Sequence, residues 1–106
     1  MPYEFGFEKT DAYRLMVEVA RWMRAQNWPT GTAHLKDQGT RAADSAVLNL
    51  AEGYTRRGRA GNNQLRIAQA SAAEVLAVLD VMDLPGSAKQ QQKLRRVAAM
   101  LQKMQR

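Results

Sequence analysis

The sequence predicts an all-α protein, a single domain over residues 1–106 folded as an antiparallel up-down-up-down four-helix bundle. Helical periodicity of the apolar residues recurs four times, over residues 11–26, 33–52, 63–84 and 88–105. Patterns typical of strands, such as period-two alternation or a hairpin turn pair, are almost absent. Because short loops join the four segments, we expect consecutive helices to pack antiparallel around one core.

The first helix, residues 11–26, follows Thr10, which is a candidate N-cap. Its apolar positions recur at the helical spacing and are Ala12, Leu15, Met16, Val19, Trp22 and Met23. Pro29 cannot continue a helix and Gly31 permits a turn, so we expect the helix to end before them. Trp28 lies in this turn, where it either covers the end of the bundle or is exposed as a contact for a partner.

The second helix, residues 33–52, has Thr32 as a candidate cap, and Gly53 is expected to end it. We expect a glycine-containing loop over residues 54–61 before the third helix, residues 63–84. Both helices are rich in alanine, which allows their backbones to approach closely. The sequence Pro-Gly-Ser at 85–87 separates the third helix from the fourth.

The charge is strongly basic, with 16 Lys and Arg against 10 Asp and Glu and a formal net charge of +6. A basic balance of this size favours polyanionic partners such as nucleic acid or an acidic protein surface. Basic residues gather in two segments without acids, the expected loop and residues 86–106. The candidate nucleic-acid-binding residues are Arg56, Arg57, Arg59, Lys89, Lys93, Arg95, Arg96, Lys103 and Arg106.

Several classes of chemistry lack the residues they need. There is no cysteine and a single histidine, His34, so we expect no metal site and no cofactor. No phosphate-binding glycine motif is present, and Ser45 and Ser71 have no histidine in reach to activate them. We therefore expect no enzymatic activity. Without a signal peptide or a long apolar run, we expect a cytoplasmic protein that makes no membrane contact.

A polar stripe runs through the second helix, where Ser45, Asn49 and Glu52 alternate with apolar residues. The third helix carries Ser71 and Glu74 three residues apart, beside alanines. One interpretation is a stripe that simply faces water. The other is a partly buried contact with the third helix or with a second subunit, in which each polar group finds a partner.

The order of these motifs resembles the 23S rRNA intervening-sequence protein family. Phe-Glu-Lys at 7–9, Arg-Ala-Ala-Asp-Ser at 41–45 and Asn-Leu-Ala-Glu-Gly at 49–53 carry the resemblance over nearly the whole chain. The matching motif positions are Arg41, Ser45, Asn49, Glu52, Gly53, Ser71 and Glu74. The sequence departs from the family pattern at Thr10, Gln64 and Ala70, where the family usually has leucine, an aromatic residue and glycine.

The resemblance implies a four-helix bundle that assembles into a ring-like homopentamer. A relative, the accessory variability protein of diversity-generating retroelements, is a basic pentamer that binds a reverse transcriptase and nucleic acid. Most members of the family have no assigned activity. Two functions therefore compete: a basic oligomer that binds RNA or DNA, directly or within a complex, and a structural adaptor that binds an acidic protein partner without nucleic-acid contact. Direct phosphate binding weakens steeply with salt, which distinguishes the two.

Overall fold

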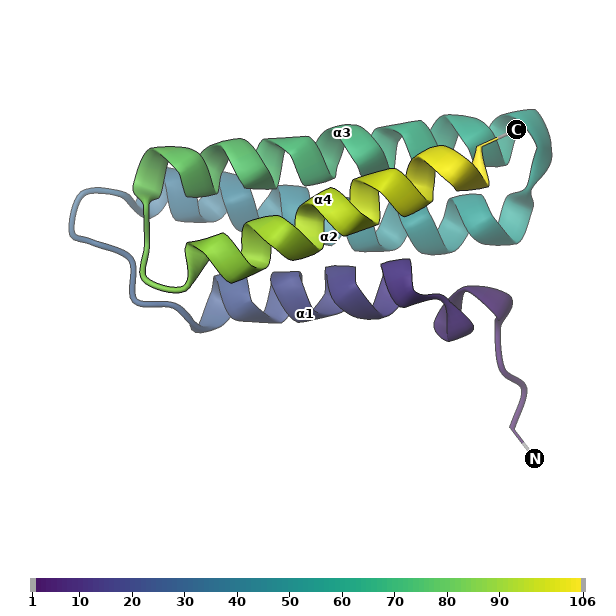
Figure 1. The fold of residues 1–106 in the computed structure, drawn as a ribbon, viewed down its shortest axis with the longest axis horizontal. Helices are drawn as coiled ribbons and strands as arrows, with labels where there is room; N and C mark the ends of the chain where they lie inside the picture. Colours follow the sequence, from purple (N-terminus) through teal and green to yellow (C-terminus); the bar gives the residue numbers. More distant parts are fainter. Residues whose placement is uncertain (1, 106) are drawn as a thin grey trace.

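The computed structural model describes residues 2–105 and shows α-helices in up-down-up-down order after a short 3-10 helix (Figure 1). The elements are η1 (Gly6–Lys9), α1 (Asp11–Ala25), α2 (Ala33–Arg56), α3 (Gly58–Met82) and α4 (Ser87–Met104). Each helix packs on its neighbours in sequence, and α4 also packs on α1, which closes the bundle. The predicted all-α up-down four-helix bundle is confirmed.

The first helix begins as its sequence predicts. The Thr10 side chain accepts a hydrogen bond from the Tyr13 amide at 3.1 Å, so it satisfies one of the backbone donors that a helix start leaves unpaired. At the other end, the Trp28 indole N–H donates to the Met23 carbonyl at 3.1 Å, and its ring packs against the core. Trp28 therefore covers the end of the bundle, which is one of the two roles that its position allowed.

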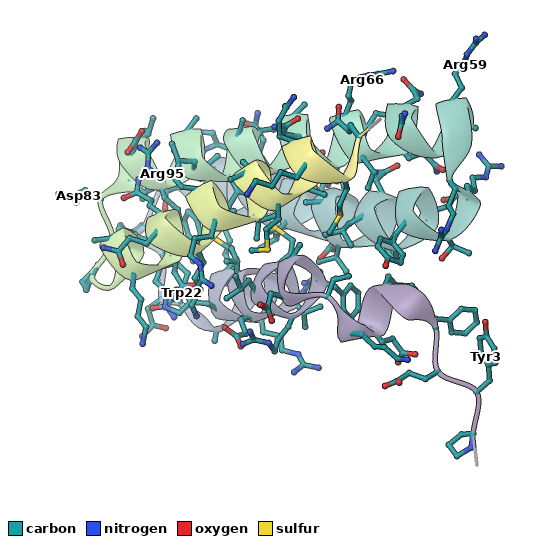
Figure 2. All side chains as sticks on the ribbon, turned by 45° about the vertical axis from the view of Figure 1, so that its right-hand side comes forward. Tyr3, Trp22, Arg59, Arg66, Asp83 and Arg95 are labelled. Atoms are coloured by element: carbon teal, nitrogen blue, oxygen red, sulfur yellow. The ribbon has the colours of Figure 1, made fainter. Side chains whose placement is uncertain are left out.

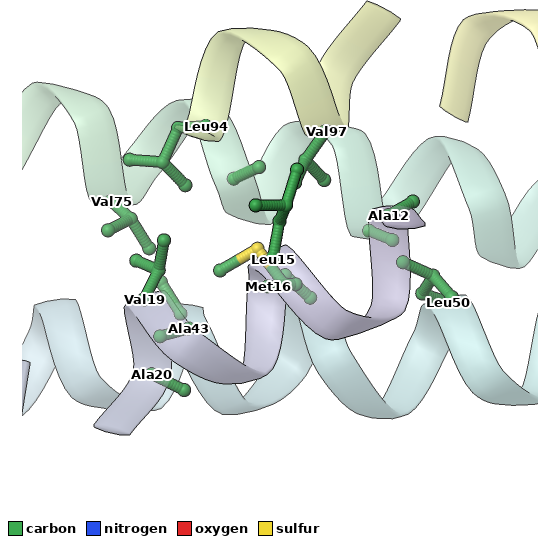
Figure 3. Packing of buried hydrophobic residues seen from close by; sticks show 14 of the residues in the cluster. Ala12, Leu15, Met16, Val19, Ala20, Ala43, Leu50, Val75, Leu94 and Val97 are labelled. Carbon is green, nitrogen blue, oxygen red and sulfur yellow. The ribbon is translucent and has the colours of Figure 1, made fainter. Parts of the chain in front are cut away.

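All four long helices contribute to the hydrophobic core (Figure 3). The largest fully buried side chains are Met16, Met23, Leu50, Leu79, Leu94, Leu101, Val19, Val75 and Val97. More than half of the buried residues of α2 and α3 are alanine or glycine, which brings these two backbones closer together than leucine would allow. Burying each leucine or valine stabilises the fold by about 1.5–3 kcal/mol relative to an exposed side chain.

The structure corrects the boundary between the second and third helices. α2 continues through Gly53 to Arg56, and α3 already begins at Gly58. The expected loop over residues 54–61 is therefore wrong, because only Arg57 is outside the helices in this stretch. Thr32 stands at the N-cap position but its hydroxyl donates to the Pro29 carbonyl at 2.6 Å, so the predicted side-chain cap of α2 does not form.

Candidate nucleic-acid interface

The α2–α3 turn is unusually tight because one residue ends the first helix and begins the second. The Arg57 amide donates to the Gly53 carbonyl at 3.1 Å, and the Arg57 carbonyl accepts from the Gly61 amide at 3.1 Å. Arg57 has φ 61° and ψ 178°, a conformation that only glycine adopts without strain. Arg57 stands at the end of the bundle because it is the residue between α2 and α3, and Gly58, with φ 63°, completes the reversal.

Close contact between the two backbones explains why glycines stand inside these helices. A Cβ atom on Gly61 would lie 2.5 Å from the Gly53 carbonyl oxygen. A Cβ atom on Gly53 would lie 2.8 Å from the Gly61 carbonyl oxygen and 3.0 Å from Leu65 Cγ. The glycines therefore let α2 and α3 touch directly before the turn. Gly53, which we expected to stop the second helix, is instead a packing position within it.

Arginines surround this turn, and we call Arg56, Arg57, Arg59 and Arg66 the arginine cluster. Arg56 is partly neutralised by Glu52, whose carboxylate lies 3.8 Å from its Nε. Arg57 lies over the Tyr54 ring, with its guanidinium carbon 5.8 Å from the ring centroid. Within residues 2–105, Arg59 and Arg66 pair with no carboxylate, and their side chains extend outward from α3 (Figure 2). Three of the four charges are thus available to an anion.

Sequence reasoning missed Arg66. It lies seven residues after Arg59, which places both on one side of a helix after two turns. That relation holds only because α3 begins at Gly58, whereas the expected helix began at residue 63. A prediction that the third helix begins at residue 58 would have placed Arg66 on the same side as Arg59.

A hollow of about 750 Å³ lies beside the arginine cluster. Among the residues that the structure describes, three guanidinium groups and no carboxylate line it. Its lining residues are Gly53, Tyr54, Arg57, Gly58, Arg59, Asn62, Leu65, Arg66 and Met104. A concave site with positive charge and no acid concentrates an anionic ligand, because low-dielectric walls strengthen the field inside it.

The basic residues of α4 have acidic neighbours from another helix. The Lys93 ammonium lies 3.1 Å from the Glu18 carboxylate of α1, and its side chain is 20% exposed. Arg96 lies close enough to Asp11 for its charge to help lower the pKa of that carboxyl, although the hydrogen bond from Arg14 is the main cause. Residues 86–106 contain no acidic residue, but acidic side chains of α1 lie next to Lys93 and Arg96 in the folded protein.

The remaining α4 candidates, Lys89, Arg95 and Lys103, are exposed. Arg95 lies toward the opposite end of the bundle from Arg59, so the two predicted groups of basic residues do not form one patch (Figure 2). Arg106 lies outside the described residues.

The polar stripe of α2 finds partners within the chain. Ser45 Oγ and Ser71 Oγ lie 3.0 Å apart, and the Asn49 amide donates to the Ser45 carbonyl at 2.9 Å. These three side chains are partly buried, and Ser45 meets the third helix through Ser71, as one interpretation of the sequence has it. Glu52, the third residue of the predicted stripe, is exposed and pairs with Arg56 of its own helix. Arg41 pairs with Asp37 at 3.2 Å along the same helix.

A hydrogen bond and an ion pair also join the outer edges of α2 to the neighbouring helices. The Glu74 carboxylate accepts from Gln38 at 3.1 Å, which joins α3 to the first half of α2. Asp44 forms a two-pronged ion pair with Arg24 of α1, with one hydrogen bond of 2.8 Å, and this contact raises the pKa of the Arg24 guanidinium. These contacts orient α2 relative to both neighbours.

A second, shallower hollow of about 450 Å³ follows this stripe. Its lining includes the carboxylates of Asp37 and Glu74 together with Arg41 and His34. The mixed charge makes it a poorer place for phosphate than the hollow at the turn. Among residues 2–105, acidic side chains and histidine nowhere gather in a group of three that could hold a metal ion.

Exposed apolar side chains lie next to the polar stripe. Leu48 is 66% exposed and Ile67 is 42% exposed, each within about one helical turn of the Ser45–Ser71 contact. The alanines Ala70, Ala73 and Ala77 of α3 are exposed as well. No helix among the described residues is both long and apolar enough to cross a membrane.

Comparison with known families identifies the chain. The family model of the 23S rRNA-intervening sequence protein matches residues 9–106, which include all four long helices. The chain belongs to this family. Comparisons with curated proteins and with solved structures found no match.

The region that matches the family contains the arginine cluster, the polar stripe and the glycine contact between α2 and α3. The segment before residue 9 lies outside the match, and it holds exposed aromatic rings. Tyr3 is 80% exposed and Phe5 is 47% exposed, and their ring centroids lie 4.9 Å apart. Tyr3 lies at the same end of the molecule as Arg59 (Figure 2).

Proposed function

We propose that this family member is a non-enzymatic protein that binds the phosphate backbone of RNA or DNA, alone or as an accessory subunit of a nucleic-acid complex. The observation that carries the proposal is the arginine cluster, in which Arg57, Arg59 and Arg66 line a hollow to which no residue of 2–105 brings a carboxylate. Guanidinium groups bind phosphate oxygens through a planar fork of donors and remain charged at every physiological pH.

The same chemistry explains which kind of recognition we propose. Contacts to phosphates supply affinity and register without reading sequence. A formal charge of +6 on a small bundle adds a long-range attraction to polyanions. The exposed α4 residues Lys89, Arg95 and Lys103 extend this attraction along the molecule, whereas Lys93 contributes less because Glu18 pairs with it.

The test is fluorescence anisotropy of a labelled RNA hairpin and a DNA duplex, titrated with protein from low to high salt. The affinity should fall steeply with salt, since each phosphate contact releases a counterion. The variant Arg59→Ala/Arg66→Ala should lower the slope of log affinity against log salt by about two. A matched control, Arg21→Ala/Lys36→Ala, removes the same charge from positions outside the arginine cluster and should change the slope much less.

Two results would contradict the proposal. Equal effects of the two double variants would show that only net charge matters and that the arginine cluster is not the site. Absence of binding even at low salt would favour the alternative function, an adaptor that binds an acidic protein partner through the same basic surface.

We also propose that the protein forms a homo-oligomer, a pentamer by resemblance to its relatives, through the outer face of α2 and α3. Exposed Leu48 and Ile67 flank the Ser45–Ser71 contact, and apolar side chains of this exposure are typical of interfaces when they lie together. Closed rings multiply the arginine cluster by symmetry, so several copies can engage one strand.

Sedimentation velocity or light scattering after gel filtration tests this assembly. Leu48→Lys places a charge on the proposed interface and should reduce the particle mass toward that of one chain. Lys is equally tolerated at position 81, because Val81 is 71% exposed and lies near the end of α3 away from the turn. Val81→Lys is therefore the control and should leave the mass unchanged. A wild-type protein that sediments as a monomer would overturn the proposal.

A further inference from the structure

The hollow beside the α2–α3 turn has two chemically different parts, and its rim is cationic. Arg57, Arg59 and Arg66 come from the turn and the first three turns of α3, and all three are exposed. No described residue offers them a carboxylate within ion-pair distance. The rim therefore matches a group that carries negative charge and several acceptor oxygens, which is the chemistry of a phosphate.

Apart from Asn62, the other side chains that line the hollow are apolar or aromatic. Leu65 is 3% exposed and forms part of its floor, and Met104, partly buried at the end of α4, closes another side. The Tyr54 ring is partly buried and gives the hollow an aromatic wall. Phosphate alone needs no such surface, whereas a flat heterocycle gains from contact with an aromatic ring and a thioether.

The position of Tyr54 is fixed by its surroundings. A Cβ atom on Gly6 would lie 3.0 Å from Tyr54 Cε1, so η1 packs directly against the ring from outside. On the turn side, the Arg57 guanidinium carbon lies 5.8 Å from the ring centroid. The exposed Arg57 guanidinium can therefore move with a ligand that enters the hollow, whereas the Tyr54 ring stays in place.

We infer that this hollow binds one unpaired nucleotide, with its phosphate on the arginine rim and its base against Tyr54, Leu65 and Met104. This inference rests on the proposed nucleic-acid function and names the ligand of the same site. The volume of about 750 Å³ is within the range of small-molecule and cofactor pockets, about 300–1,000 Å³. A paired base is stacked inside a duplex and cannot enter, so the site prefers single strands, strand ends or free nucleotides.

The test compares Tyr54→Leu with Tyr54→Phe, which both lack the hydroxyl but differ in the aromatic ring. Each is titrated with a 5′-phosphorylated single strand and with a duplex, after circular dichroism confirms the helical content. Tyr54→Leu should weaken single-strand binding roughly 5- to 150-fold, the usual effect of losing one base–aromatic stack. Tyr54→Phe should retain it, and both variants should bind duplex as the wild-type protein does.

A competition experiment distinguishes base recognition from phosphate recognition. AMP should displace the labelled strand at a lower concentration than inorganic phosphate, because the base adds contacts in the hollow. Equal displacement by AMP and phosphate would overturn the inference. Competition by AMP also identifies the free nucleotide as a ligand. If an unlabelled strand competes far better than AMP at the same concentration of phosphate groups, the site binds the nucleotide as part of a strand.

These outcomes separate this inference from the proposed function. If neither single strand nor duplex binds at low salt, the nucleic-acid function itself fails. If both bind and Tyr54→Leu behaves as Tyr54→Phe does, the arginine cluster binds phosphates on its surface and the hollow holds no base.

Discussion

The contact between Gly53 and Gly61 predicts that a single methyl group at residue 61 separates α2 from α3. In Gly61→Ala the new Cβ would lie 2.5 Å from the Gly53 carbonyl oxygen, and a backbone atom cannot move away by changing a rotamer. The helices must separate, and overpacking of this kind costs about 3 kcal/mol at the upper end of its usual range. Alanine offsets about 1 kcal/mol of this through its higher helix propensity.

The net loss in the free energy of unfolding is therefore about 2 kcal/mol, which lowers the Tm by roughly 8–16 °C in a domain of this size. Urea unfolding, followed by circular dichroism at one protein concentration, measures this loss in the free energy of unfolding. Gly39→Ala is the matched control in α2. Its Cβ would lie 2.7 Å from Met23 Cε and 3.1 Å from Val78 Cγ1, which are side-chain atoms and not backbone. Met23 can move its flexible end and Val78 needs to shift only by tenths of an ångström, so the stability should stay within about 1 kcal/mol of the wild type. If Gly61→Ala is as stable as Gly39→Ala, the direct backbone contact is refuted.

Three further predictions follow from strain, burial and charge. Arg57→Gly should raise the free energy of unfolding by about 1 kcal/mol, because glycine adopts this backbone conformation without strain. The affinity of the same variant for nucleic acid should fall, because one positive charge is lost. Urea unfolding measures the first effect and anisotropy the second, and a less stable variant would contradict the first. Gln90→Met should stabilise the fold by about 1 kcal/mol in urea unfolding, because the buried Gln90 Oε1 finds no hydrogen-bond partner within residues 2–105; a loss of stability would show that the amide is satisfied. The Arg14 side chain donates to Asp11 at 2.9 Å and lowers the pKa of that carboxyl, so the pair stabilises the fold above the pKa of an unfolded aspartate and loses this contribution as pH falls through the lowered pKa. Arg14→Ala should raise the pKa of Asp11 in an NMR titration, and an unchanged pKa would show that the pair does not form in solution.

The fold could be predicted from sequence because its helices are amphipathic and its ends are marked. Buried Leu15, Val19 and Met23 recur at helical spacing, and the Thr10 cap acts through its own local geometry. Local patterns failed where a residue serves a distant contact. Gly53 and Gly61 have the composition of a loop, but they are glycines because another helix touches them there.

The candidate site was predictable only in part, for the same reason. Arg57 and Arg59 stand out as basic residues without nearby acids, but the hollow beside them needs Met104 from the far end of the chain. Charge along the sequence also misrepresented α4. The partner of Lys93 is Glu18, which is remote in sequence and adjacent in space.

The most direct test of the central claim is an NMR titration of the isotope-labelled protein with a short RNA strand. The backbone amides of Gly58, Arg59 and Arg66 should shift first and saturate together, while those near Trp28, at the other end of the bundle, should stay unchanged. Shifts confined to α4, or spread evenly over the surface, would contradict an interface at the α2–α3 turn.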